Sequence, residues 1–357
     1  MCCNGCIFLA LQIVISLYMS FSSRGASVFP EKHWTVIDPN RAGLVTDKLE
    51  LFQKFVGGRG CIIRHGNLVF TWGDQTKSSD VASAFKPLLT TLLFIAIHED
   101  KIPSLDSKVS DFEPRLKELG KDAVITWRHL ANQISGYGLT EHPGRAYSYN
   151  DFALALYYDI LIGKVFASTG DEVLRTRLAE PLGFEDRNTF NAFGLRDRPG
   201  RLSLSVRDFA RFGLLYLQRG KWRDKQLLPP QLIDLALSNP LPPQFPLTTG
   251  HEAAMLPNQR SIGGSRNITA VGPGYYSFNW WLNKSNALGQ KLFVDAPTDT
   301  YLASGHGGQS ALWIFPAWDM IVSWNDSPID DHDKSPGNRD SKCNMAIRLL
   351  KAALKSE

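Results

Sequence analysis

The alternation of hydrophobic and polar positions gives strand-like segments near both ends of the chain and helical segments between them. Apolar residues recur with helical spacing over residues 43–56. Two apolar runs then flank His65-Gly66-Asn67, a tight-turn sequence, so we expect a β-hairpin there. The almost wholly apolar run from Leu88 to Ile97 predicts a buried helix from about residue 83 to residue 98.

Helical patterns continue from about residue 125 to residue 235, with breaks at proline and glycine. The segment "SLSVRDFARFGLLYLQRG" is the clearest, because Ser205 is a capping residue, Asp208 is third in the helix and Gly220 follows its end. Residues 236–275 are rich in Pro, Gly and Asn and lack a period. A loop of this length in a compact domain usually surrounds a site.

Short strand-like runs return toward the end of the chain: "YYSFNWWL", "KLFVDA", "TYLASG", "SALWIFP" and "MIVSW". A closing helix is expected over about 342–354. Strands at both ends with helices between them predict an α/β (α+β) fold. We expect an antiparallel sheet layer from about 43–75 and 270–357, flanked by helices, with an inserted all-helical subdomain over about 83–260.

The first 27 residues form a separate segment. Cys6 to Phe21 is apolar apart from Gln12 and a few hydroxyl residues, and Gly25-Ala26-Ser27 offers small residues for cleavage. This pattern is typical of a signal peptide and predicts an exported protein, periplasmic or secreted. No Lys or Arg precedes the apolar stretch, so an uncleaved membrane anchor is the alternative. Residues 28–357 would form the folded domain.

Composition narrows the function. Of the 357 residues, 43% are hydrophobic and 21% charged, an ordinary globular balance, and the net charge of +4 is spread without a basic run. Nucleic-acid binding is therefore not expected. If the leader is removed, Cys61 and Cys343 remain, either paired or, as we favour, as two separate buried thiols. There is no Cys-x-x-Cys and no His/Cys cluster at metal spacing, so we expect no metal or cofactor.

Ser83-Ala84-Phe85-Lys86 is the one Ser-x-x-Lys sequence in the chain. Residues three apart share a helix face, so the hydroxyl and the amine can meet. A serine needs a neighbouring base to become a nucleophile, and a desolvated lysine of lowered pKa can be that base. The alternative is a surface serine beside a snorkelling lysine, since about one such spacing arises by chance at this length. Pro87 has no N–H, so either the first turn is irregular or the helix begins later.

Two further motifs carry candidate chemistry. Tyr149-Asn150-Asp151 opens a helical stretch, and a tyrosine beside a lysine can relay protons, although most such tyrosines serve packing. Ser304-Gly305-His306-Gly307-Gly308 is glycine-rich between two strands. A backbone N–H there could join that of Ser83 to hold an oxyanion, whereas the alternative is a plain hairpin turn.

The order and spacing of these motifs resemble the serine β-lactamase and penicillin-binding-protein superfamily, and most of all its class C-like, esterase-like branch of β-lactamase-related serine hydrolases. The resemblance extends over about residues 57–350. It includes "SLDSKVSDFEP", "ITWRHLANQISGYG" and "RLSLSVRDFARFGLLYLQRGKWRDKQLLP", which are similar to segments between that family's motifs. It implies a β-lactamase/transpeptidase-like fold.

The resemblance also implies roles for individual residues. Ser83 would be the acylated nucleophile, Lys86 its proton acceptor and Tyr149 a general base and acid. The oxyanion hole would consist of the backbone N–H groups of Ser83 and Gln309.

The substrate-binding positions follow from the same match: Asn150, Asp151, His306, Gly307 and Gly308. Asp151 takes the place of an asparagine that contacts a substrate amide in the family. His306-Gly307-Gly308 falls on a strand motif that reads Lys-Thr-Gly in β-lactamases and His-x-Gly in many esterase-like relatives. A neutral histidine would hold a substrate carboxylate poorly.

We therefore expect a serine hydrolase of the Ser-x-x-Lys type that acts on a small ester or an uncharged amide. The alternatives are a weak β-lactamase or D-Ala-type peptidase, and a catalytically silent relative that binds peptides or cell-wall fragments. An α/β-hydrolase is disfavoured because no Gly-x-Ser-x-Gly elbow occurs. Contact with a membrane is expected only through an uncleaved N-terminal segment.

Overall fold

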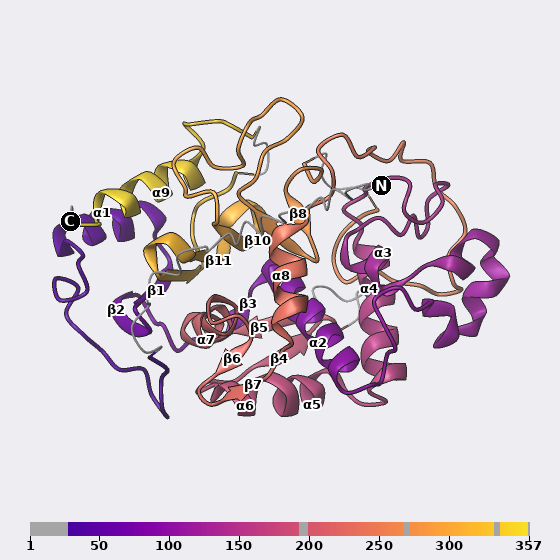
Figure 1. The fold of residues 1–357 in the computed structure, drawn as a ribbon, viewed down its shortest axis with the longest axis horizontal. Helices are drawn as coiled ribbons and strands as arrows, with labels where there is room; N and C mark the ends of the chain where they lie inside the picture. Colours follow the sequence, from indigo (N-terminus) through magenta and orange to yellow (C-terminus); the bar gives the residue numbers. More distant parts are fainter. Residues whose placement is uncertain (1–27, 193–198, 267–270, 332–335, 356–357) are drawn as a thin grey trace, which may run out of the picture.

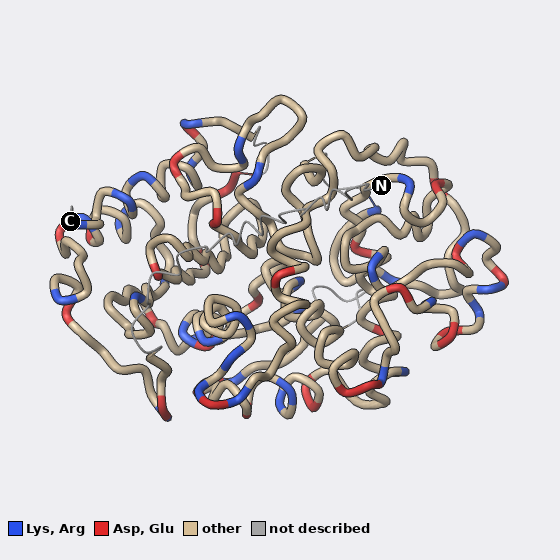
Figure 2. Tube along the Cα trace, in the orientation of Figure 1, with Lys and Arg blue, Asp and Glu red and all other residues tan. Residues whose placement is uncertain are grey.

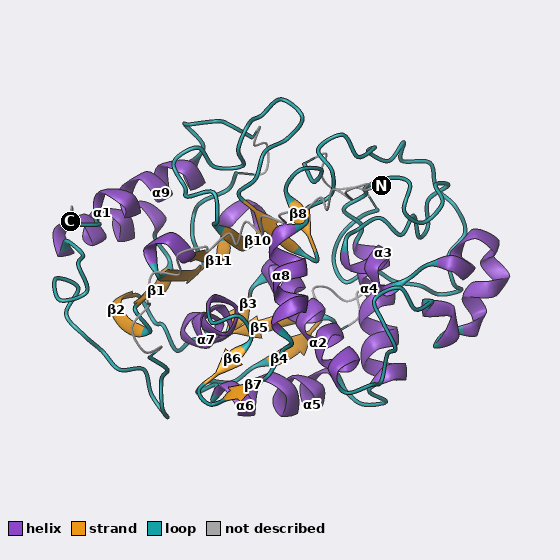
Figure 3. Ribbon diagram, in the orientation of Figure 1, coloured by secondary structure: helices purple, strands orange, loops and turns teal. Residues whose placement is uncertain are grey.

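The computed structural model describes residues 28–192, 199–266, 271–331 and 336–355, and its centre is one antiparallel sheet (Figures 1 and 3). Across these residues the strand order is β2-β1-β12-β11-β10-β9-β8. The strands are β1 (Arg59–Arg64), β2 (Asn67–Trp72), β8 (Tyr276–Ser277), β9 (Trp280–Leu282), β10 (Tyr301–Gly305), β11 (Ser310–Phe315) and β12 (Met320–Asn325). The two ends of the chain therefore meet in one sheet at the β1–β12 pair, as predicted.

Helices cover both faces of this sheet. The helices α1 (Thr46–Val56) and α9 (Lys342–Ala352) lie side by side on one face, and α7 (Val206–Leu217) packs on the other (Figure 1). Alternate residues of a strand point to opposite faces. Accordingly, Val322 packs in the core beneath α1 and α9, while Ile321 packs in the core on the side of α7.

Turn and capping chemistry explains several predicted boundaries. The β1–β2 hairpin turns through His65 (φ 51°) and Gly66 (φ 73°), the left-handed conformations of a tight hairpin turn. The hydroxyl of Ser205 accepts a hydrogen bond from the Asp208 N–H at the start of α7, and Gly220 (φ 80°) follows its end.

The predicted helix over residues 83–98 divides at its first turn. Ala82–Phe85 forms a 3₁₀ turn, and the α-helix α2 runs from Lys86 to His98. Pro87 lies in the first turn of α2. The N–H groups of a first turn have no partner within the helix, so a proline there removes no helical hydrogen bond. Nearly every side chain of α2 is buried, so the helix is a central element of the core.

The insertion is mainly but not wholly helical. Its remaining α-helices are α3 (Trp127–Ala131), α4 (Asp151–Ile160), α5 (Gly170–Leu174), α6 (Glu180–Leu182) and α8 (Pro230–Ser238). 3₁₀ segments lie at Val109–Asp111 and Pro114–Val124. Two small sheets form in it or at its edge. One joins β3 (Ser79–Asp80), just before the insertion, to β5 (Arg201–Leu204) and β4 (Thr189–Asn191), and the other pairs β6 (Lys221–Trp222) with β7 (Lys225–Gln226). Strands this short leave little periodicity in a sequence, and the pattern did not predict them.

The segment "KLFVDA" is not a strand, although its pattern predicted one. The side chain of Asn283 binds its backbone instead. It accepts a hydrogen bond from the Phe293 N–H and donates to the carbonyls of Ala296 and Pro297. A buried asparagine thus supplies the hydrogen bonds that a neighbouring strand would have supplied.

Within the described residues, no single helix has the length and apolar character to cross a bilayer; only Asp151–Val165 and Gly170–Leu182 taken together do, and they are bent by 77°. The predicted leader, residues 1–27, lies outside the described residues. Cys61 and Cys343 are both buried, and no disulfide joins them. Basic and acidic residues are interspersed along the trace (Figure 2).

Candidate active site

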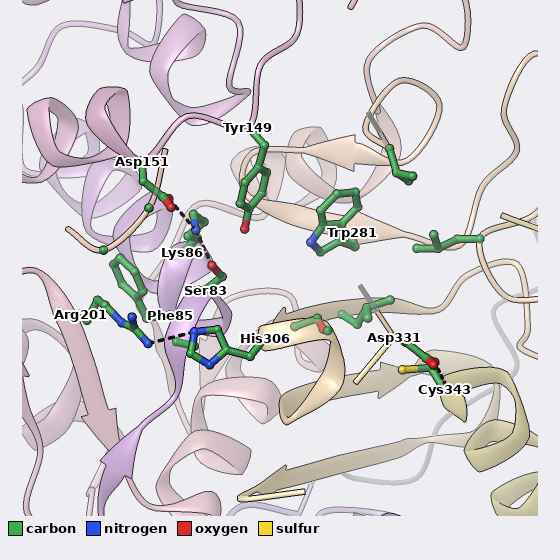
Figure 4. Close-up of a pocket in the computed structure, with 18 of the residues that line it drawn as sticks. Ser83, Phe85, Lys86, Tyr149, Asp151, Arg201, Trp281, His306, Asp331 and Cys343 are labelled. Atoms are coloured by element: carbon green, nitrogen blue, oxygen red, sulfur yellow. Dashed lines mark hydrogen bonds and ion pairs between the residues drawn. The ribbon is translucent and has the colours of Figure 1, made fainter. Parts of the chain in front are cut away.

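A cavity of about 670 Å³ lies where the sheet meets the insertion (Figure 4). Residues from the 3₁₀ turn before α2, the start of α4, strands β5, β9 and β10, the loop before β8 and the start of α9 line it. The long loop predicted over residues 236–275 contributes Ile262, Gly263, Gly264, Ser265 and Val271. This cavity brings together parts of the chain that lie far apart in sequence.

Ser83 is presented to the cavity by a strained turn. The residue before it, Ala82, has φ 49°, a left-handed conformation that is unfavourable for alanine. The carboxylate of Asp80 accepts a hydrogen bond of 2.7 Å from the Ala82 N–H and stabilises this turn. Strand β10 lies against it through Gly305, where a Cβ would collide with the carbonyl oxygen of Val81. The turn therefore has little freedom to move.

Lys86 is buried directly behind this serine. Its Nζ donates a hydrogen bond of 2.7 Å to the Oγ of Ser83 and lies 3.1 Å from the Oδ1 of Asp151. The side chain of Lys86 is only 2% exposed. Its Nζ also lies 4.4 Å from the centre of the Tyr149 ring. The amine is thus in contact with a hydroxyl, a carboxylate and an aromatic ring.

The charge state of Lys86 differs from the sequence-based expectation. Burial alone would lower the pKa of Lys86, but attraction to Asp151 and to Tyr149 outweighs burial and raises that pKa above its ordinary value. These two contacts favour the ammonium form of Lys86. The sequence-based expectation of a desolvated, neutral lysine did not include the carboxylate of Asp151, which contacts Lys86 from helix α4.

Tyr149 closes the other side of the serine. Its phenol oxygen points toward Ser83 and Lys86 (Figure 4). The ring stacks on Trp281, with ring centres 6.0 Å apart and planes 25° from parallel, and meets Tyr276 edge-on. This packing fixes the ring's direction. Ser83, Lys86 and Tyr149, three residues predicted from sequence, thus line one cavity together with Asp151.

Asn150 lies outside the cavity and serves the fold. Its Oδ1 accepts hydrogen bonds from the N–H groups of Phe152 and Ala153, which makes it the N-cap of α4. Its Nδ2 donates to the carbonyl of Tyr137. The side chain is buried and its hydrogen-bonding atoms are engaged, so the predicted substrate contact from Asn150 is corrected to a helix cap.

The glycine-rich motif is divided between cavity and core. His306 and Gly307 line the cavity, whereas Gly308 and Gln309 do not. The N–H of Gln309 donates to the carbonyl of His306 within a 3₁₀ turn. The Gln309 N–H is therefore already engaged within the motif, and the residues of the motif that line the cavity are His306 and Gly307.

Two residues that line the cavity, Arg201 and Trp281, were not predicted from the sequence. Arg201 on β5 is buried, forms a 2.5 Å ion pair with Asp80 and places its Nη2 3.5 Å from the Nε2 of His306. Trp281 on β9 covers Tyr149. Arg201 belongs to a short strand that the pattern did not predict. Trp280 and Trp281 are neighbours in strand β9, so their side chains point to opposite faces of the sheet. This alternation could have indicated that only one of the two is fully buried.

Among the residues placed in the structure, no group of three or more His, Cys, Asp or Glu side chains could hold a metal ion.

A family model and several solved structures resemble this chain. The sequence model of the beta-lactamase family matches residues 45–324. Similar solved structures include a candidate beta-lactamase from Bacteroides dorei, with a TM-score of 0.61 at 14% identity, covering 87% of this chain and 98% of that one. No curated protein sequence matches the chain.

Two other solved structures share the fold. A protein from Bacillus anthracis, assigned as a 6-aminohexanoate-dimer hydrolase, has a TM-score of 0.59 at 15% identity, covering 91% of this chain and 90% of its own. EstCE1, a hydrolase with promiscuous acyltransferase activity, has a TM-score of 0.57 at 15% identity, covering 85% and 98%. At identities of 14–15%, the structural likeness shows a common fold and nothing more specific.

Proposed function

Because the chain belongs to the beta-lactamase family, whose members are serine hydrolases, we propose that it hydrolyses an ester or an uncharged amide through an acyl-enzyme on Ser83. One observation carries the proposal: the Ser83 hydroxyl lies 2.7 Å from a buried ammonium and faces a phenol inside a cavity. A surface serine beside a snorkelling lysine would show none of this burial.

The charge of Lys86 decides which group takes the serine proton. An ammonium has no lone pair to accept a proton, so Lys86 acts as a hydrogen-bond donor and stabilises negative charge on the neighbouring phenol oxygen. The proposal requires the deprotonated form of Tyr149, which accepts the proton of Ser83 as the serine oxygen attacks the carbonyl carbon. The backbone N–H of Ser83 is our proposed donor to the oxyanion.

The proton then returns to the substrate. Tyr149 donates it to the leaving alcohol or amine as the bond from the carbonyl carbon breaks, which leaves an ester on Ser83 and regenerates the phenolate. A water molecule attacks this ester with Tyr149 again as base, and Ser83 recovers its proton when the acid departs. Asp151 is a positioning residue, because it acts by keeping Lys86 charged.

The pH profile of an Asp151→Asn variant tests this assignment. Without the carboxylate, burial lowers the pKa of Lys86 and only Tyr149 still opposes it. Since the mechanism requires the ammonium, the alkaline fall in kcat/KM should move to lower pH than in the wild type. If neutral Lys86 were the base, the same variant would instead gain activity at lower pH.

The charges that line the cavity favour a neutral substrate. Lys86 is paired with Asp151, and Arg201 with Asp80. His306 stands where β-lactamases carry a lysine for the substrate carboxylate. A weak β-lactamase or D-Ala-type peptidase is our second candidate, because Arg201 is a buried cation beside His306.

A direct comparison of two substrates separates these candidates. We expect kcat/KM for p-nitrophenyl acetate to exceed that for a chromogenic cephalosporin by about a hundredfold, since a carboxylate without a dedicated cation is poorly held in a buried site. Both reactions are followed by absorbance in the same buffer. Preference for the cephalosporin would reverse the ranking.

A further inference from the structure

The cavity is lined differently on the two sides of Ser83. Asp151 and Arg201 lie on one side, and Trp281 lies on the other, with Cys343 beyond it (Figure 4). Around Trp281 the lining is largely apolar. We call this part the apolar arm, and it consists of Trp281, Leu292, Phe293, Leu302 and Cys343.

The apolar arm belongs to the hydrophobic core beneath α1 and α9. Leu302 on β10 pairs directly with Trp281 on β9. Phe293, Leu302 and Cys343 are buried members of that core, and Trp281 and Leu292 pack against it with part of their surface exposed. A ligand in this arm would therefore contact side chains that the fold itself holds in place.

The polar groups at the far end of the arm are already engaged. The carboxylate of Asp331 accepts hydrogen bonds from the N–H groups of Lys342 and Cys343 at the start of α9. None of the five residues that form the arm carries a positive charge, and the carboxylate of Asp331 would repel a negatively charged ligand. Burying an unpaired carboxylate here would be strongly unfavourable. The arm suits an uncharged hydrocarbon group.

The position of Tyr149 indicates which half of the substrate enters the arm. In the proposed reaction Tyr149 gives its proton to the leaving group, which must lie against the phenol. The ring of Tyr149 stacks on Trp281, which forms one wall of the arm. We propose that the apolar arm binds the alcohol or amine portion of the substrate and selects one that is apolar and uncharged. This inference rests on the proposed function.

Two isomeric esters test the inference. Hexyl acetate and ethyl hexanoate have the same atoms, but the long chain lies on the alcohol in the first and on the acid in the second. Burial of a methylene group is worth roughly 0.8 kcal/mol, which is about fourfold in kcat/KM. Acid release in a pH-stat should therefore give hexyl acetate about a hundredfold advantage over ethyl acetate and at least about tenfold over ethyl hexanoate.

A pair of leucine variants assigns this preference to the arm. Leu292→Asp places a carboxylate in the arm and should lower the ratio of kcat/KM for hexyl acetate to that for ethyl acetate at least about tenfold. Leu288 lies in the same loop, is 80% exposed and lies outside the cavity. Leu288→Asp is the matched control and should keep the wild-type ratio.

The outcomes distinguish the inference from the function beneath it. Turnover of ethyl acetate without preference for hexyl acetate, or an equal gain with ethyl hexanoate, overturns the inference and leaves the hydrolase standing. A preference that Leu292→Asp and Leu288→Asp reduce equally also overturns it. If the wild-type protein hydrolyses none of the three esters but is labelled on Ser83 by a serine-directed phosphonate, the inference alone is overturned. If it is not labelled either, the proposed function fails, and the inference fails with it.

Discussion

Replacing Ser83 by alanine should reduce kcat/KM for p-nitrophenyl acetate by about 10⁴-fold or more, because the acyl-enzyme cannot form without its hydroxyl. The variant should fold normally. The Ser83 side chain contributes a hydrogen bond to Lys86 at the edge of a cavity, and Asp151 still pairs the lysine when that bond is lost. Initial rates and circular dichroism together measure the two effects.

A serine outside the cavity provides the control. Ser104 is exposed and bonds only within its own turn. Ser104→Ala should retain wild-type rates within about twofold. A Ser83→Ala protein that keeps a substantial share of activity would show that another group carries the reaction.

Lys86→Ala should lower kcat/KM about 10³-fold and also destabilise the protein. The loss of activity follows from removing the ammonium that holds the serine oxygen and stabilises the phenolate. The loss of stability arises because Asp151 would stay buried without its partner, which typically reduces the free energy of unfolding by about 3 kcal/mol. Urea titration measures the second effect independently of the first.

A double variant separates the two effects. Removing the carboxylate as well, in Lys86→Ala with Asp151→Asn, leaves no unpaired charge. We expect most of the lost stability to return while activity stays low. If the double variant is no more stable than Lys86→Ala alone, the ion pair does not have the role described here.

The sequence predicted those parts of the fold that depend on local chemistry. Three such features are the His65-Gly66 turn, the Ser205 cap and the irregular first turn at Pro87. Each depends on only a few neighbouring residues, so it can be predicted from the local sequence. The pairing of the two chain ends followed from strand-like segments at both ends. The short strands around Arg201 escaped prediction because two to four residues carry no clear period.

The sequence predicted which residues form the candidate site better than it predicted the contacts between them. Ser83, Lys86 and Tyr149 were found by spacing and order, and they line one cavity. The ionisation of Lys86 depends on Asp151, which approaches from another helix. Such a contact between helices is set by tertiary packing.

Backbone hydrogen bonding explains the other two differences. Asn150 was predicted to contact substrate, but helix α4 needs a cap at that position. Gln309 was predicted to donate to the oxyanion, but its N–H bonds to His306 in a turn. Residue type alone does not reveal whether a polar group binds substrate or completes the hydrogen bonding of a helix or a turn.

The most direct test of the account is the mass of the intact protein after reaction with a serine-directed phosphonate, followed by peptide mapping. The account predicts one adduct per chain, located on Ser83 and absent from Ser83→Ala. A wild-type protein that stays unmodified, or that carries the adduct on a different serine, would contradict it and favour a relative that binds its ligand without catalysis.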